Sequence, residues 1–162
     1  MRALVQRVAR ARVTVEGRVT GEIGRGLLVL LAAAHEDGER EAAWLAQKLA
    51  GLRIFADDAG LMNVDVRAAG GAALVVPQFT LYGDARRGRR PDFTRAARPE
   101  RAQPLLERFC QRLEGEGVRV ERGVFGAHMQ VELVNDGPVT LMVETPGLAA
   151  GSAAADREES PA

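Results

Sequence analysis

Residues 129–144 read MQVELVNDGPVTLMVE, and this stretch constrains the fold more than any other. Its flanks, Met129–Val134 and Val139–Glu144, alternate or cluster apolar residues as half-buried strands do. The letters NDG between them fit a tight turn. Pro138 does not fit the start of an ordinary strand, because proline lacks the N–H that a strand ladder uses. The simplest interpretation is a turn ahead of a strand at a sheet edge.

Two helices are expected from apolar residues at helical spacing. The first covers Glu39–Phe55, and Asp37 is placed to cap its start. The second covers roughly Pro99–Glu114. Pro104 predicts that this helix starts or bends there, because proline cannot donate the hydrogen bond of an uninterrupted helix.

Strands account for most of the remaining chain and give an α+β fold in a single domain. Short apolar runs separated by glycines predict an antiparallel meander before the first helix. The domain is expected to cover residues 1–148, and residues 149–162, small and polar, are expected to form a disordered tail. The other predicted strands are Ala3–Val8, Ala11–Val15, Arg18–Ile23, Leu27–Ala34, Ala72–Val76 and Val118–Glu121.

Composition bounds the class of protein. The 162 residues are 46% hydrophobic and 27% charged, which is typical of a soluble globular domain. The formal net charge is zero, so any basic surface for nucleic acid must be local. Cys110 is the single cysteine, which excludes an intramolecular disulfide and indicates a reducing compartment. The N-terminus lacks the apolar core of a signal peptide, and the longest apolar run is too short to cross a bilayer.

Few side chains can serve as catalysts. Serine occurs only in the tail, at Ser152 and Ser160, which argues against a Ser–His–Asp hydrolase. Cys110 lies on the apolar stripe of the second helix, so we expect a core residue. His35 and His128 are far apart and lack ligand spacing, so no metal site is expected, and no glycine-rich phosphate loop follows a strand.

Two further stretches could carry function. QFTLYGD, residues 78–84, is expected to be extended, with Phe79 and Leu81 on one side and Gln78 and Thr80 on the other. It could equally be an ordinary strand end. Residues 83–98 carry six arginines in a predicted loop, which could be a solvated loop or a grip on phosphate oxygens.

Taken together, these stretches resemble the D-aminoacyl-tRNA deacylase family. The resemblance rests on VPQFTLYGD, GRRPDF and FGAHMQVELVNDGPVTL, in this order after MRALVQRV, and covers residues 1–145. It implies a barrel-like sheet, hydrolysis of the ester between a D-amino acid and tRNA, and removal of glycine mischarged on alanine tRNA. It also implies a cytoplasmic homodimer that needs no metal or other cofactor.

The resemblance also assigns roles to residues. Gly137–Pro138 corresponds to a cis Gly-Pro pair that enters the partner subunit's active site and rejects L-aminoacyl groups by its main chain. The main-chain N–H groups of Phe79 and Thr80 would form an oxyanion hole, and the Thr80 side chain would orient the substrate. Phe79 would pack against the terminal adenine or ribose, Gln78 would bond the terminal nucleotide, and the substrate's ribose 2′-hydroxyl would activate or orient water. Pro77 replaces the family's serine, which puts any role of that hydroxyl in doubt. Arg7 would brace the Gly-Pro segment and Met129 would line the pocket; the candidates for tRNA phosphates are Arg86, Arg87, Arg89 and Arg90.

Three other interpretations stay open at this point. Relatives with a trans Gly-Pro act on L-aminoacyl-tRNA, and the dipeptide alone does not reveal its isomer. A non-catalytic RNA-binding protein would use the arginine-rich loop and show steep salt dependence without turnover. A structural protein would use Gly137–Pro138 only as a turn.

Overall fold

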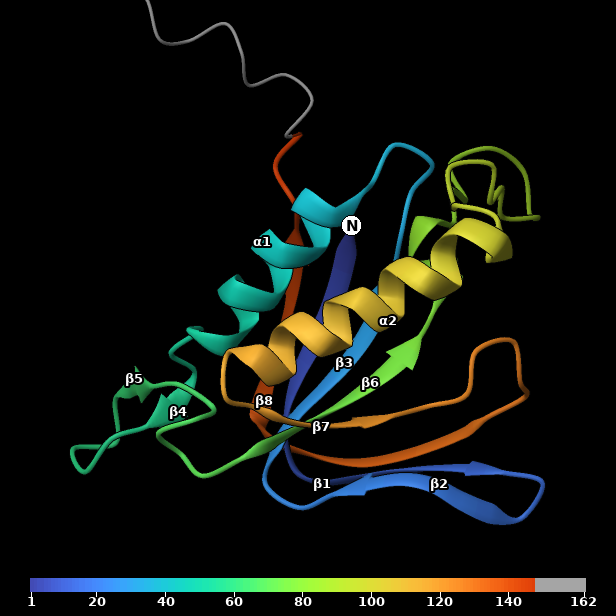
Figure 1. Ribbon diagram of the computed structural model, residues 1–162. Helices are drawn as coiled ribbons and strands as arrows, with labels where there is room; N and C mark the ends of the chain where they lie inside the picture. The colour runs from blue at the N-terminus through green and yellow to red at the C-terminus, as the bar shows by residue number, and fades with distance from the viewer. Residues whose placement is uncertain (148–162) are drawn as a thin grey trace, which may run out of the picture.

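The computed structural model describes residues 1–147, and the predicted tail lies outside them. The helices are α1 (Glu39–Ala50) and α2 (Pro99–Gly115), with a single 3-10 turn, η1 (Phe79–Tyr82). The strands are β1 (Arg2–Val15), β2 (Arg18–Ile23), β3 (Gly26–Ala32), β4 (Phe55–Ala56), β5 (Met62–Val64), β6 (Ala72–Pro77), β7 (Arg119–Arg122) and β8 (Gln130–Glu144). Figure 1 shows both helices on one side of a strongly twisted sheet, which confirms the α+β prediction.

The long strand β1 organises the sheet. One of its edges pairs with β8, and its other edge is shared between β3, along Arg2–Val8, and β2, along Ala11–Val15. These three pairings are antiparallel, but the predicted meander is wrong because β3 lies beside β1 and not beside β2. β6 and β7 join in parallel, since α1 and α2 lie in the connections that return the chain to the same end of the sheet.

Residues 129–144 form a single strand, so the predicted turn between two strands is wrong. Both halves of β8 pair with β1, through Val8 opposite Asn135 and Gln6 opposite Thr140. Residues 136–139 therefore lie opposite Arg7 alone and form a large bulge. Pro138 is tolerated because β8 pairs on one side only and the ladder is interrupted at the bulge.

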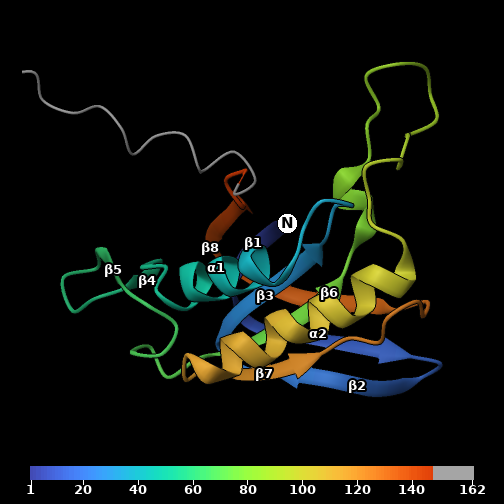
Figure 2. The same cartoon turned by 45° about the horizontal axis from the view of Figure 1, so that its top comes forward.

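The two helices pack on each other and on one face of the sheet (Figure 2). Their buried side chains, such as Leu45 and Phe109, meet sheet residues such as Val29 in the larger core cluster. A second cluster lies on the opposite face, where β2 folds back toward β6 and β7. At Gly21 on β2, an added Cβ would lie 2.8 Å from the Arg122 carbonyl oxygen, so the sheet curls almost into a barrel.

Both helices begin where the sequence predicts, at Glu39 and Pro99, but three details of their ends and caps differ from prediction. α1 ends at Ala50 because Gly51 caps it, and Phe55 enters β4 instead. Asp37 is not the N-cap; Gly38 holds that position, and the Asp37 carboxylate is buried against the amino group of Met1 at 2.7 Å. α2 begins at Pro99 and includes Pro104, so a start at Pro104 is wrong.

Candidate active site

A cavity of about 600 Å³ opens where β3 and β6 end beside α2. Most of its lining is apolar, and Gln78, Arg98 and His128 are the polar side chains in it. A concave, mainly apolar site with a few polar groups is typical of small-ligand binding. The apolar lining includes Leu31, Val76, Pro77, Phe79, Phe93, Ala97, Ala102, Leu106, Phe125, Met129 and Val131.

The QFTL segment forms one wall of this cavity. The Gln78 N–H donates to the Leu31 carbonyl oxygen at 2.8 Å, which fastens the end of β6 to β3. The chain then enters η1, so the predicted extended conformation is wrong. The turn brings the Gln78 amide onto the Thr80 hydroxyl and leaves Phe79 58% exposed, with its ring packed edge-on against Phe93 at 5.2 Å. Gln78 and Phe79 line the cavity, and Thr80 is bonded to Gln78 beside it.

The segment between β7 and β8 forms the opposite wall. Met129, Phe125 and His128 line the cavity from this segment. Sequence reasoning missed these two residues, as well as Arg98 and Phe93. The available signals were the motifs FGAHM, which contains Phe125 and His128, and GRRPDF, which contains Phe93. Both were noted for the resemblance and not for a place in a pocket.

The Gly137–Pro138 bulge lies elsewhere on the sheet. The peptide bond between these residues is cis, and neither residue lines the cavity. The bulge lies opposite Arg7, which pairs with Leu27 on β3, whereas the cavity is at the Leu31 end of that strand. The structure therefore does not bring the two predicted parts of the site together within one chain.

Side chains hold the bulge on both sides. Arg7 donates from Nε to the Asp136 carbonyl oxygen and from Nη1 to the Ile54 carbonyl oxygen, each at 2.7 Å. On the other side, Asn135 Oδ1 accepts the Val139 N–H at 2.9 Å. Because the bulge is tied at two points, it presents its main chain in a fixed position.

The arginine-rich loop projects from the body of the molecule beyond η1 (Figure 2). A bridge between Asp84 and Asp92 closes its base. Arg86 is paired with Asp84 at 2.5 Å, and its guanidinium lowers the pKa of that carboxyl to about 2. Arg87, Arg89 and Arg90 are exposed and take part in no ion pair within residues 1–147. Unlike Arg86, they could therefore contact an anionic ligand without breaking an ion pair.

Among residues 1–147, the titratable groups offer no activated nucleophile. Burial raises the pKa of the Cys110 thiol to about 12, in agreement with its predicted place in the core. His35 is bonded through Nε2 to the Thr94 carbonyl oxygen at 2.7 Å. Within residues 1–147, no three His, Cys, Asp or Glu side chains gather as a metal site would require, and no helix is long and apolar enough to span a membrane.

Comparison with known proteins identifies the chain. It is 60% identical over 145 residues to a protein of Symbiobacterium thermophilum and 61% identical over 145 residues to one of Anaeromyxobacter dehalogenans, both named D-aminoacyl-tRNA deacylase. Each match covers 90% of this chain, and 96% and 97% of the respective relatives. These relatives define the class, enzymes that hydrolyse carboxylic ester bonds. Within it, the chain belongs to the D-Tyr-tRNA(Tyr) deacylase family, whose model matches residues 4–144.

Two solved structures share the fold of this chain. The structure titled "c-Myc DNA Unwinding Element Binding Protein" superposes with a TM-score of 0.85 at 40% identity, covering 90% of this chain and 99% of that one. A probable eukaryotic D-amino acid tRNA deacylase shares the fold with a TM-score of 0.79 at 19% identity, covering 89% and 98%. The resemblance noted in the sequence and the barrel-like α+β fold are thus confirmed.

Proposed function

We propose that this protein hydrolyses the ester bond of D-aminoacyl-tRNA, and of glycine mischarged on alanine tRNA, releasing the amino acid and the tRNA. The observation that carries the proposal is a cavity walled by Gln78 and Phe79 in a chain 60% identical to a D-aminoacyl-tRNA deacylase. A cytoplasmic location is part of this proposal.

Selection of the D form is assigned to the main chain of Gly137 and Pro138. D and L substrates differ only in the direction in which the side chain leaves the α-carbon. A rigid wall at that carbon excludes one hand, because overlap with backbone atoms is costly. The two carbonyl oxygens would accept from the substrate's ammonium group and leave no space for an L side chain. Glycyl-tRNA would be accepted, because glycine has no side chain to collide with this wall. The bonds from Arg7 and Asn135 support this role because they immobilise the bulge.

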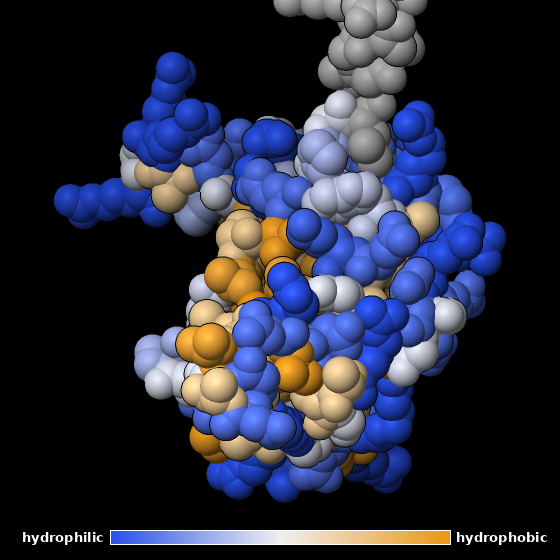
Figure 3. Space-filling view, turned by 90° about the vertical axis from the view of Figure 1, so that its left-hand side faces the viewer, coloured by the Kyte–Doolittle hydropathy of each residue, from blue (hydrophilic) through white to orange (hydrophobic). Residues whose placement is uncertain are grey.

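A second copy of the chain is proposed to complete the site. The filter and the cavity lie apart within one subunit, so the bulge of one copy would enter the cavity of another. Apolar side chains of β8 support such a homodimer: Val134, Leu141 and Met142 are 41%, 37% and 48% exposed. Figure 3 shows apolar atoms gathered at the surface of the molecule, seen from the left-hand side of Figure 1. An apolar surface of this kind marks an interaction site.

Catalysis is proposed to rest on position and main-chain donors. The N–H groups of Phe79 and Thr80 open η1, and the first N–H groups of a helix lack partners within it. They would stabilise the oxyanion that forms at the ester carbonyl. Gln78 and Thr80, already bonded to each other, would orient the terminal nucleotide, and the substrate's 2′-hydroxyl would activate or orient water. Pro77, with no hydroxyl, contributes only an apolar surface here.

The tRNA body is proposed to contact the arginine-rich loop. Arg87, Arg89 and Arg90 are exposed there and would bind phosphates, whereas Arg86 would first have to exchange its pairing with Asp84. Replacing the three free arginines together should therefore weaken tRNA binding and its salt dependence more than replacing Arg86 alone.

The activity is tested with D-Tyr-tRNA in EDTA, by following release of tyrosine. The proposal predicts turnover; binding that falls steeply with salt and is never followed by hydrolysis would favour an RNA-binding protein instead. The shared site is tested by mixing two impaired variants, Gly137→Ala and Phe79→Ala, and comparing the mixture with each variant alone. A mixed dimer combines the intact cavity of the first with the intact bulge of the second, so mixing should restore activity. No recovery in verified mixed dimers would contradict a site built from two subunits.

A further inference from the structure

Gly123 occupies a position where a side chain would collide with the cavity wall. It directly follows β7, and its N–H donates to the Val75 carbonyl oxygen at 2.8 Å. A Cβ built on it would lie 2.8 Å from the sulfur of Met129 and 3.5 Å from Cδ of Pro77. Met129 and Pro77 both line the cavity, so the space left by the missing side chain lies directly behind the wall.

The glycine is needed for space and not for backbone conformation. The chain uses positive φ at nearby Gly117 and Gly126, with φ of 90° and 75°, but not at Gly123. An alanine could therefore adopt the same main-chain angles. The Met129 side chain is folded back, so that its sulfur accepts the Val124 N–H at 3.3 Å. An alanine at position 123 would displace the thioether from this position.

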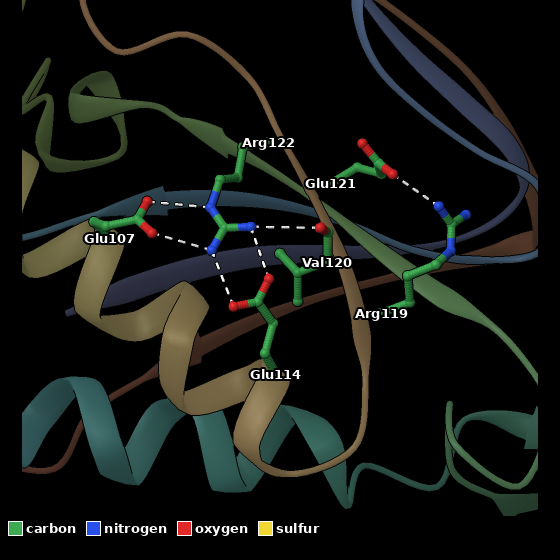
Figure 4. A network of polar contacts seen from close by, with 6 residues as sticks. All are labelled: Glu107, Glu114, Arg119, Val120, Glu121 and Arg122. Atoms are coloured by element: carbon green, nitrogen blue, oxygen red, sulfur yellow. Dashed lines mark hydrogen bonds and ion pairs between the residues drawn. The ribbon is translucent and has the colours of Figure 1, made fainter.

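The main chain at Gly123 is held from the other side by an ion cluster. Arg122 is paired with Glu107 at 3.1 Å and with Glu114 at 2.9 Å, and both carboxylates come from α2 (Figure 4). Together with the bond to Val75, this cluster keeps residue 123 from retreating. An added methyl must therefore displace the flexible side chain of Met129, because methionine has three rotatable bonds and adapts easily.

We propose that Gly123 is a positioning residue of this enzyme: its missing side chain lets the Met129 thioether lie back in the wall and so sets the width of the cavity. The inference rests on the proposed function, because the cavity is taken to receive the aminoacyl end of the tRNA. The displaced thioether would narrow the cavity for every substrate, which weakens binding without touching the reacting groups.

The test compares Gly123→Ala with Gly123→Ala/Met129→Ala and with Met129→Ala alone. Gly123→Ala should raise KM for D-Tyr-tRNA about tenfold or more, the effect expected of a misfitting methyl group, and change kcat much less. The double variant should have the same KM as Met129→Ala, because it lacks the thioether that the methyl at residue 123 would displace. The control is Gly24→Ala, where an added Cβ meets nothing within 4 Å, and its KM should be unchanged.

A readout independent of activity follows the methyl group of Met129 by NMR in protein labelled at its four methionines. The Met129 signal should shift in Gly123→Ala and stay in place in Gly24→Ala. An unmoved signal, or a double variant as impaired as Gly123→Ala, would overturn the positioning role. Failure of the wild type to hydrolyse D-Tyr-tRNA would overturn the proposed function instead, and the methyl signal would still decide whether residue 123 positions Met129.

Discussion

Arg7 is the side chain on which the position of the Gly-Pro bulge depends most directly. Its guanidinium reaches two carbonyl oxygens at 2.7 Å, one in the bulge and one in the segment before β4, and its side chain is 15% exposed. Lysine keeps the charge but offers all its donors from one atom, so Arg7→Lys should lose one of these two bonds. A hydrogen bond to a charged group contributes about 1.5–3 kcal/mol.

The loss of one such hydrogen bond should lower the rate of deacylation by a measurable factor. If all of this free energy serves to position the bulge, kcat/KM for D-Tyr-tRNA should drop by roughly 10- to 150-fold, since each 1.4 kcal/mol is a factor of ten. Deacylation kinetics measure the drop, and urea denaturation verifies that the variant is folded. The matched control is Arg12→Lys, on the same strand but in an exposed pair with Glu22, which should change little. Wild-type kcat/KM in Arg7→Lys would refute the idea that Arg7 positions the bulge.

Three further variants test other parts of the account. Gly137→Ala places a methyl 2.6 Å from the main-chain nitrogen two residues on, so deacylation should fall about tenfold or more, while Gly24→Ala stays at wild-type rate; equal rates would contradict a close-fitting main chain. Asp37→Asn removes the charge that pairs with a fully buried ammonium, so urea denaturation should show a loss of about 3–5 kcal/mol in unfolding free energy, and a loss below about 1 kcal/mol would contradict a buried pair. Arg122 lowers the pKa of Glu114 from the ordinary 4.5, so this pair stabilises the fold above that pH and its contribution is lost as the pH falls through the lowered value. Arg122→Gln should therefore lower Tm at pH 7 and flatten its decline toward pH 3; an unchanged Tm profile would argue against the pairing.

Local sequence patterns predicted the elements but not their partners. Helical spacing located α1 and α2, and alternation located most strands, because these patterns record which face of each element is buried. The continuity of β8 was missed because it depends on β1, more than a hundred residues away, which pairs with both halves. The capping role assigned to Asp37 failed for the same reason, since its actual partner is the amino group of Met1.

In the candidate site too, short sequence motifs predicted some residues, whereas others depend on contacts distant in the sequence. Gln78, Phe79 and Met129 were found through a resemblance in short motifs, and the structure brings them to one cavity. Phe93 and Arg98 reach that cavity only because the loop between η1 and α2 folds back beside residues 33 and 34, just after β3. Such convergence leaves no periodic signal in the sequence. The proposed meeting of bulge and cavity requires a second chain, which no local pattern encodes.

We propose that this protein selects the D form of an aminoacyl-tRNA by the main chain at Gly137 and Pro138. The most direct measurement is hydrolysis of D-Tyr-tRNA and L-Tyr-tRNA side by side by the wild-type protein, in EDTA. The account predicts rapid release of tyrosine from the D ester while the L ester decays only at its spontaneous rate. Cleavage of both esters at comparable rates, or of the L ester alone, would contradict it.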